Sequence, residues 1–258
     1  EISPQLESDP PRHVVVLLHG LMRSRGSMSN LEAKLKSESY TDVIRFSYAS
    51  TRASIADHAH ALREVLEGMP EETQFSFVGH SMGNIVTRHM LGDLAIDDPK
   101  GVLPRCHAMV MLGPPNQGAA IARRLATTGI FGMVTGKGGM ELGPHWQELE
   151  TRLATPSFPF TIVAGDLAFK SVAIRNPLLD GSSDLVVSVE ETFLEGAKNH
   201  ETVPVLHSVL MNDERVQEIT VEFLDQHGPA NPSSPKTAQT PPHTPGQTDA
   251  GASQQQNR

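Results

Sequence analysis

The feature that most constrains the fold of this chain is an apolar run that ends in a Gly-x-Ser-x-Gly pentapeptide. The run covers residues 75–78, the pentapeptide GHSMG covers residues 79–83, and a helical pattern follows over residues 84–90. A strand that turns sharply into a helix at a serine is the arrangement of a nucleophile elbow. The flanking glycines let the backbone bend and hold the serine in a strained conformation that exposes its hydroxyl. The pattern therefore predicts Ser81 as a nucleophile.

Short apolar runs alternate with helical patterns along most of the chain. Nearly continuous apolar runs of this length are typical of strands that are covered on both faces. The predicted strands are His13–Leu18, Val43–Tyr48, Phe75–Val78, His107–Leu112 and Phe160–Ala164. The predicted helices are Ser27–Ser37, Ile55–Glu67, Asn84–Leu94 and Asp213–Gln226. This alternation predicts an α/β fold, with a mostly parallel, doubly wound sheet and helices on both faces.

The chain divides into one large domain and two polar ends. Its 258 residues can hold one α/β domain, which we place at residues 12–227. Residues 1–11 form a polar leader that contains three prolines. Residues 228–258 contain no Val, Ile, Leu, Met or aromatic residue, so they cannot bury enough surface to offset the entropy cost of ordering. We expect this tail to be disordered.

Composition argues against several classes of partner. The formal charge is −9 and no Lys/Arg cluster forms a stripe, so no nucleic acid partner is expected. No run of about 18 apolar residues occurs, so no transmembrane segment is expected. The single cysteine, Cys106, cannot form an intramolecular disulfide, which slightly favours a cytoplasmic location over a secreted or envelope one. No ligand spacing indicates a metal, and no cofactor is expected.

A serine nucleophile needs a base that takes its proton and a carboxylate that fixes the tautomer of that base. At an elbow of this kind the chain order is serine, then acid, then histidine. His207 is the preferred base, because it follows the short apolar run at residues 203–206 and so lies on a loop after the last strand. His200, in a more polar stretch, is the second candidate.

Three aspartates compete for the acid position: Asp166, Asp180 and Asp184. Asp166 follows the predicted strand at residues 160–164, and Asp184 lies in a polar turn that runs into apolar residues. We favour Asp184 and keep Asp166 as the alternative, partly on the resemblance described below. An aspartate that is not the acid has a simple role as a turn-former.

A second apolar strand, at residues 14–18, ends in His19-Gly20-Leu21. A His-Gly pair at this distance before the elbow indicates the loop that supplies one half of an oxyanion hole. The amide of Met82, directly after the serine, is expected to supply the other half. Two such N–H groups stabilise a carbonyl oxygen as it becomes negative.

Together these motifs resemble the α/β-hydrolase superfamily and, within it, the bacterial lipase and esterase group. The similar stretches are HGL at 19–21, GHSMG at 79–83, LGPPNQG at 112–118, SDLVVS at 183–188 and LHS at 206–208. The resemblance spans about residues 12–226 and implies hydrolysis of carboxylic esters. It also implies a triad of Ser81, Asp184 and His207, with the amides of Leu21 and Met82 as the oxyanion hole.

The chain departs from that group at two positions. Asn84 stands where many lipases have a further glycine after the elbow, and Leu185 replaces the glycine of the acid turn.

Residues from about 117 to 149 interrupt the alternation of strands and helices with apolar residues beside glycines. Enzymes of this group insert a cap or lid there, so we expect a cover over the acyl pocket, either mobile or packed in place.

The expected partner is a small-molecule ester or lipid substrate. A thioesterase, an amidase or a phospholipid deacylase can use the same fold and triad, so these remain alternatives. Transfer of the acyl group to an acceptor other than water is another. A catalytically silent binding module is the alternative from a different class, and the serine, acid and histidine in the right order argue against it.

Overall fold

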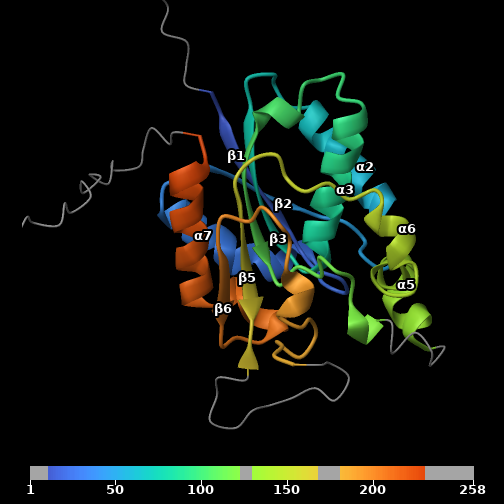
Figure 1. Cartoon of the computed structure of the whole chain (residues 1–258). Coiled ribbons are helices and arrows are strands. Elements are labelled where there is room, and N and C mark those ends of the chain that lie inside the picture. Colours follow the sequence, from blue (N-terminus) through green and yellow to red (C-terminus); the bar gives the residue numbers. More distant parts are fainter. Residues whose placement is uncertain (1–10, 123–129, 168–180, 230–258) are drawn as a thin grey trace, which may run out of the picture.

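The computed structural model describes residues 11–122, 130–167 and 181–229 (Figure 1). The predicted leader up to residue 10 and the predicted tail from residue 230 onward lie outside the described residues. The same holds for Asp180 and for residues 123–129 of the predicted insertion.

A parallel sheet forms the centre of the described fold. Its strands are β1 (His13–Leu18), β2 (Asp42–Phe46), β3 (Gln74–His80), β4 (Cys106–Leu112), β5 (Phe160–Gly165) and β6 (His200–Val203). They lie in the order β2-β1-β3-β4-β5-β6, and each neighbouring pair is parallel. The order reverses around β1, so β3 lies beside the first strand in the middle of the sheet. Because the strands are parallel, the loops after β1, β3 and β6 leave the sheet at the same edge, where the carboxyl ends of the strands lie. Ligand-binding loops of open α/β sheets lie at this edge.

Helices cover both faces of the sheet (Figure 1). The longer ones are α1 (Ser29–Ser37), α2 (Ile55–Glu67), α3 (Met82–Ile96), α5 (Ile130–Leu142), α6 (Trp146–Glu150) and α7 (Glu214–His227). Short 3-10 helices are η1 (Arg25–Met28), η2 (Leu103–Arg105), η4 (Glu190–Thr192) and η5 (His207–Asn212). This is the α/β architecture that the alternation of patterns predicts. None of the described helices is both long and apolar enough to cross a membrane.

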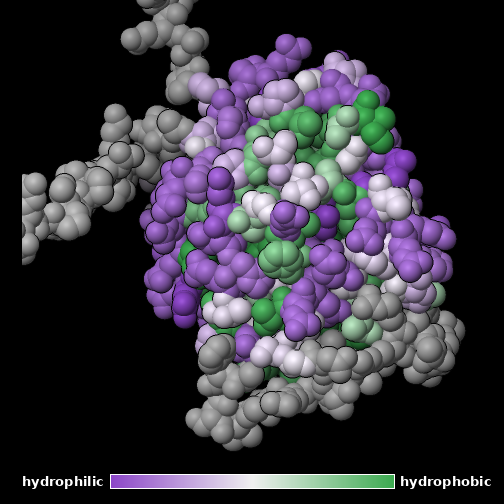
Figure 2. All heavy atoms as spheres, in the orientation of Figure 1, coloured by the Kyte–Doolittle hydropathy of each residue, from purple (hydrophilic) through white to green (hydrophobic). Residues whose placement is uncertain are grey.

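Alternate residues of β1 enter two different cores. Val14, Val16 and Leu18 pack with the buried residues of α2 and α3, while Val15 and Leu17 pack with those of α1 and α7. Because both faces are covered, the strand is apolar throughout rather than alternating. Hydrophilic residues cover the outer face of α7 in Figure 2, so this helix presents only one apolar side to the sheet.

Local capping signals explain why α2 matches its predicted bounds. The Ser54 hydroxyl accepts the Asp57 N–H at 3.1 Å, and the Asp57 carboxylate accepts the Ser54 N–H at 3.0 Å. This reciprocal pair is a capping box, and Gly68 ends the helix. The α3 helix begins at Met82, two residues earlier than predicted, because the turn at Ser81 leads directly into it.

Two segments differ from the expectations in detail. The last strand is β6, at His200–Val203, rather than the apolar run at residues 203–206. Within the predicted insertion the chain forms α5 and α6, and α5 contains a kink at Gly136, where φ is 65° and ψ is −159°. Only a residue without a side chain adopts that conformation easily.

Candidate active site

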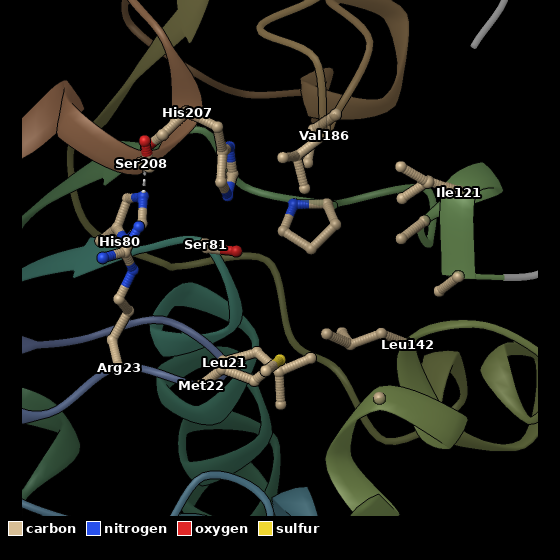
Figure 3. A pocket seen from close by; sticks show the side chains of 15 residues that line it. Leu21, Met22, Arg23, His80, Ser81, Ile121, Leu142, Val186, His207 and Ser208 are labelled. Carbon is tan, nitrogen blue, oxygen red and sulfur yellow. Dashed lines mark hydrogen bonds between the residues drawn. The ribbon is translucent and has the colours of Figure 1, made fainter. Parts of the chain in front are cut away.

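Ser81 follows β3 and forms the N-terminal cap of α3. Its backbone lies at φ 53° and ψ −123°, a region that L-residues rarely adopt. The Ser81 N–H donates to the Leu112 carbonyl oxygen at 2.8 Å, which fixes the strained turn against β4. Figure 3 shows the Ser81 hydroxyl pointing into a cavity. The strand, sharp turn and helix of the predicted elbow are all present.

At the two glycines of the elbow, neighbouring atoms come so close to the backbone that no side chain fits. A Cβ at Gly83 would lie 2.7 Å from the Leu18 carbonyl oxygen, and one at Gly79 would lie 2.3 Å from Oδ1 of Asn84. The Asn84 side-chain amide donates to the carbonyl oxygens of Ser81, at 3.1 Å, and Leu112, at 3.3 Å. Asn84, a departure from the lipase pattern, therefore fills the space beside Gly79 and ties the elbow to β4.

His207 and Asp184 meet at the same edge of the sheet. Nδ1 of His207 lies 2.6 Å from Oδ2 of Asp184, whose side chain is buried. The other carboxylate oxygen accepts the N–H groups of Val186, at 3.0 Å, and Val187, at 2.8 Å. These bonds compensate the burial of the carboxylate. A carboxylate beside Nδ1 keeps the proton there and makes Nε2 the basic nitrogen.

Two glycines leave room for this pair. Gly113 has a φ of 54°, and a Cβ there would lie 3.0 Å from Nδ1 of His207. A Cβ at Gly165 would lie 2.6 Å from Cβ of Asp184. The ends of β4 and β5 thus approach the acid and the base so closely that a larger residue would displace them.

His80 holds the backbone of the base, a contact that the sequence does not reveal. Its Nε2 lies 2.8 Å from the His207 carbonyl oxygen, and the two rings are 4.8 Å apart. Burial, helped by the nearby His207, lowers the pKa of His80 well below its usual value, so the ring is neutral and donates from Nε2. Since 127 residues separate the partners, no local pattern could have indicated this bond.

The amides of Leu21 and Met82 are the predicted oxyanion hole. Among the residues that the structure describes, neither N–H donates to a protein acceptor. Both are therefore available to a substrate. The next residue, Met22, adopts a φ of 57°, and its N–H donates to the Ser50 hydroxyl at 3.0 Å. The Tyr48 hydroxyl donates to the His19 carbonyl oxygen, and the two rings stack 4.1 Å apart. Ser50 and Tyr48 thus hold the backbone of the loop after β1 by hydrogen bonds from residues outside this loop.

A cavity of about 470 Å³ lies in front of Ser81 and His207. Most of its walls are apolar. The larger apolar side chains that line it are Leu21, Met22, Ile121, Leu142, Val186 and Val187. Leu142 comes from α5, so the predicted insertion forms part of the wall. In Figure 3, Leu142, Ile121 and Val186 lie together on one side of Ser81. The cavity is of the size and polarity expected for a small apolar ligand.

The other predicted candidates lie elsewhere. Asp166 is buried after β5, and its N–H donates to the Val203 carbonyl oxygen at 2.8 Å, while His207 pairs with Asp184. His200 is the first residue of β6, and its Nε2 lies 2.8 Å from the Thr192 hydroxyl.

Burial raises the pKa of the Cys106 thiol to about 12, which argues against a cysteine nucleophile. Among the described residues, no three His, Cys, Asp or Glu side chains gather as a metal site.

Comparison with known proteins supplies a family model and several solved structures. Residues 8–128 match the family described as "Putative serine esterase (DUF676)". The structure is similar to mature Bacillus licheniformis lipase BlEst2, with a TM-score of 0.63 at 15% identity, over 86% of this chain and 94% of that one. This chain has the α/β-hydrolase fold. No curated protein sequence matches it.

Two further solved structures resemble the chain. Metagenomic carboxyl esterase MGS0156 gives a TM-score of 0.54 at 14% identity, over 84% of this chain and 72% of that one. Phospholipase PlaB from Legionella pneumophila gives 0.54 at 18% identity, over 70% of this chain and 45% of that one. The family match covers the predicted oxyanion loop and Ser81 but ends before Asp184 and His207. In α/β-hydrolases the nucleophile, acid and base occur in the order that Ser81, Asp184 and His207 follow.

Proposed function

We propose that this chain hydrolyses carboxylic esters of small molecules or lipids through an acyl-enzyme on Ser81. The observation that carries the proposal is the pairing of His207 with the buried Asp184 beside the cavity into which the Ser81 hydroxyl points. The order of Ser81, Asp184 and His207 along the chain, with serine first, then acid, then histidine, supports the same assignment. The similarity of residues 8–128 to a family of serine esterases supports the same chemistry.

In the first step, Nε2 of His207 takes the proton of the Ser81 hydroxyl while the oxygen attacks the ester carbonyl. Asp184 holds the proton on Nδ1 and stabilises the imidazolium that forms. The protonated His207 then gives its proton to the leaving alcohol, and an acyl-enzyme remains. Water attacks the acyl group with the same help from His207, which releases the acid and restores Ser81.

The negative oxygen of each tetrahedral intermediate needs donors that are already in place. The amides of Leu21 and Met82 are suited to this task, since neither is used by another acceptor in the described part of the chain. Met82 is also the first residue of α3, so the positive end of the helix dipole lies behind it. Such donors are typically worth about 3 kcal/mol of barrier each.

The apolar walls favour an ester whose acyl part is a hydrocarbon chain. A thioesterase, an amidase or a phospholipid deacylase remains an alternative on the same triad, and transfer to an acceptor other than water is a further one. Matched esters, thioesters and amides of one acyl chain separate the first three. Added alcohols that divert the acyl group to a new ester reveal transfer.

The test is hydrolysis of p-nitrophenyl esters of graded chain length by the wild type and by Ser81→Ala. We expect the wild type to turn over and the variant to lose at least about a thousandfold in kcat, because the nucleophile is absent. A folded Ser81→Ala variant that keeps its rate would overturn the assignment of the nucleophile. A folded wild type that cleaves none of the esters would overturn the proposed activity.

A further inference from the structure

Arg23 stands apart from the apolar lining of the cavity. It belongs to the loop after β1, two residues beyond Leu21, and its side chain lines the same cavity as Ser81 and His207. Its N–H donates to the Gly20 carbonyl oxygen at 3.2 Å, so the backbone at this point is part of the turn that forms the oxyanion loop. In Figure 3 the Arg23 side chain extends toward His80.

The guanidinium of Arg23 has no carboxylate partner among the described residues. Arg12, Arg45, Arg63 and Arg152 each form an ion pair with an acidic side chain. Among the residues that the structure describes, no ion pair includes Arg23 and no acidic side chain lines the cavity. A guanidinium presents several donors in a plane that matches the oxygens of a phosphate or a carboxylate.

The cavity is therefore polar at one end and apolar at the other. Arg23, His80 and Ser208 lie on one side of Ser81 in Figure 3. Ile121, Leu142 and Val186 lie on the opposite side and form an apolar wall. An ester that binds across Ser81 places its two halves in these two environments. The hydrocarbon half fits the apolar wall, and an anionic half fits Arg23.

The charge of the whole chain makes this position distinctive. A formal charge of −9 repels anions in general, so an anionic substrate gains from a local cation at the mouth of its site. A solvent-exposed arginine on a loop can also serve solubility alone. Its place in the lining of the cavity, on the side opposite the apolar wall, favours a role in substrate binding.

We propose that the site prefers esters of an apolar acid whose alcohol portion carries a phosphate or a carboxylate, and that Arg23 binds this anion. This inference rests on the proposed esterase function and adds the charge of the substrate to it. The acyl chain lies along Ile121, Leu142 and Val186, and the alcohol leaves on the side of Arg23 and Ser208.

The experiment compares monomeric esters with one octanoyl chain: octanoyl glycerol, its 3-phosphate, octanoyl glycolate and p-nitrophenyl octanoate. In the wild type we expect kcat/KM for the phosphate ester to exceed that for octanoyl glycerol about tenfold, mainly through KM. The glycolate arm shows whether a carboxylate is recognised as well as a phosphate. Added salt should reduce the preference, because the charges meet near the solvent.

Arg23→Gln should bring the ratio of anionic to neutral kcat/KM close to one, and Arg23→Lys should keep only part of it. Arg25→Gln is the matched control, since Arg25 is an exposed arginine two residues further along, at the start of η1, and does not line the cavity. It should leave the ratio at its wild-type value. A wild-type ratio near one, or a ratio that survives in Arg23→Gln, would overturn the inference. If p-nitrophenyl octanoate is not cleaved either, the esterase function itself fails.

Discussion

Three residues with side chains occupy the left-handed region of backbone conformation around the site. They are Met22 in the predicted oxyanion loop, Ser81 in the elbow and Leu185 in the predicted acid turn, with φ values of 57°, 53° and 79°. Each costs about 1–3 kcal/mol, which the surrounding structure must offset. The hydrogen bonds of Met22 to Ser50 and of Ser81 to Leu112 do this for the first two. Backbone strain is thus concentrated at the predicted catalytic groups.

Leu185 gives a direct test of that strain. Its left-handed φ is the conformation that a glycine favours, which explains why similar enzymes carry glycine in this turn. We expect Leu185→Gly to change the free energy of unfolding by less than about 1 kcal/mol and to keep activity, since relief of strain offsets the added chain entropy. Leu185→Ile should cost about 1–2 kcal/mol, because a β-branched residue is poorly tolerated there. Urea unfolding and kcat measure both.

Equal stability of the glycine and isoleucine variants would contradict this account of the turn. The readout in kcat matters, because the N–H groups of Val186 and Val187 that follow Leu185 hold the Asp184 carboxylate. A distorted turn should therefore reduce kcat as well as stability.

The assignment of the acid is tested by two parallel substitutions. Asp184→Asn should lower kcat about a hundredfold to ten-thousandfold, because the amide no longer fixes the tautomer of His207. Asp166→Asn should have a much smaller effect on kcat in protein that circular dichroism shows to be folded. The reverse order of effects would make Asp166 the acid.

At the scale of the elements, a glycine-rich part of α5 packs directly against the segment after β2 and against Met82. A Cβ at Gly136 would lie 1.7 Å from the Thr51 carbonyl oxygen. A Cβ at Gly138 would lie 2.9 Å from Sδ of Met82 and 2.9 Å from the Ser50 carbonyl oxygen. The predicted insertion thus does more than cover the pocket, because its backbone lies against a residue of the predicted oxyanion hole.

Gly138→Ala should therefore slow catalysis. The added methyl group would lie too close to Sδ of Met82 and to the Ser50 carbonyl oxygen, so α5 or these neighbours must shift. A shift that reaches the Met82 amide weakens its hydrogen bond to the developing oxyanion. We expect kcat for a p-nitrophenyl ester to fall about tenfold or more. Gly26→Ala is the control, since its methyl group would come no closer than 3.4 Å to Ser24. Equal rates in the wild type and Gly138→Ala would contradict this role for α5.

Elements with strong local signals could be predicted from the sequence, and those that depend on distant contacts could not. β1 and α2 have their predicted bounds, because a buried strand is apolar throughout and α2 has a capping box and a terminal glycine. β6 is an edge strand of polar residues that is defined by its pairing with β5, so no apolar run indicates it. The contacts of His80 with His207 and of Gly138 with Met82 join distant segments, and no pattern within either segment encodes them.

For the molecule as a whole, buried and partly buried histidines predict a pH dependence of stability. Burial lowers the pKa of His13 from 6.5 to about 4, and it also lowers the pKa values of His19, His58 and His80. The unfolded chain binds these protons below about pH 6.5, whereas the folded chain does not until a lower pH. Unfolding therefore takes up protons in this window, and stability falls as the pH drops from about 6.5 toward 4.

Urea unfolding at several pH values measures this slope. His13→Gln should reduce the proton uptake on unfolding near pH 5 by about one proton, because glutamine does not titrate. His60→Gln, at an exposed position on α2, is the control and should keep the wild-type slope. A stability that is constant between pH 4.5 and 6.5 would contradict the burial of neutral imidazoles.

We expect Ser81, activated by His207 and Asp184, to form the covalent intermediate. The most direct measurement treats the protein with a p-nitrophenyl alkylphosphonate and maps the adduct by mass spectrometry of peptides. We predict one adduct, on the peptide that contains Ser81, together with loss of esterase activity in proportion to labelling. An adduct on another residue, or full activity in protein that is labelled at Ser81, would contradict it.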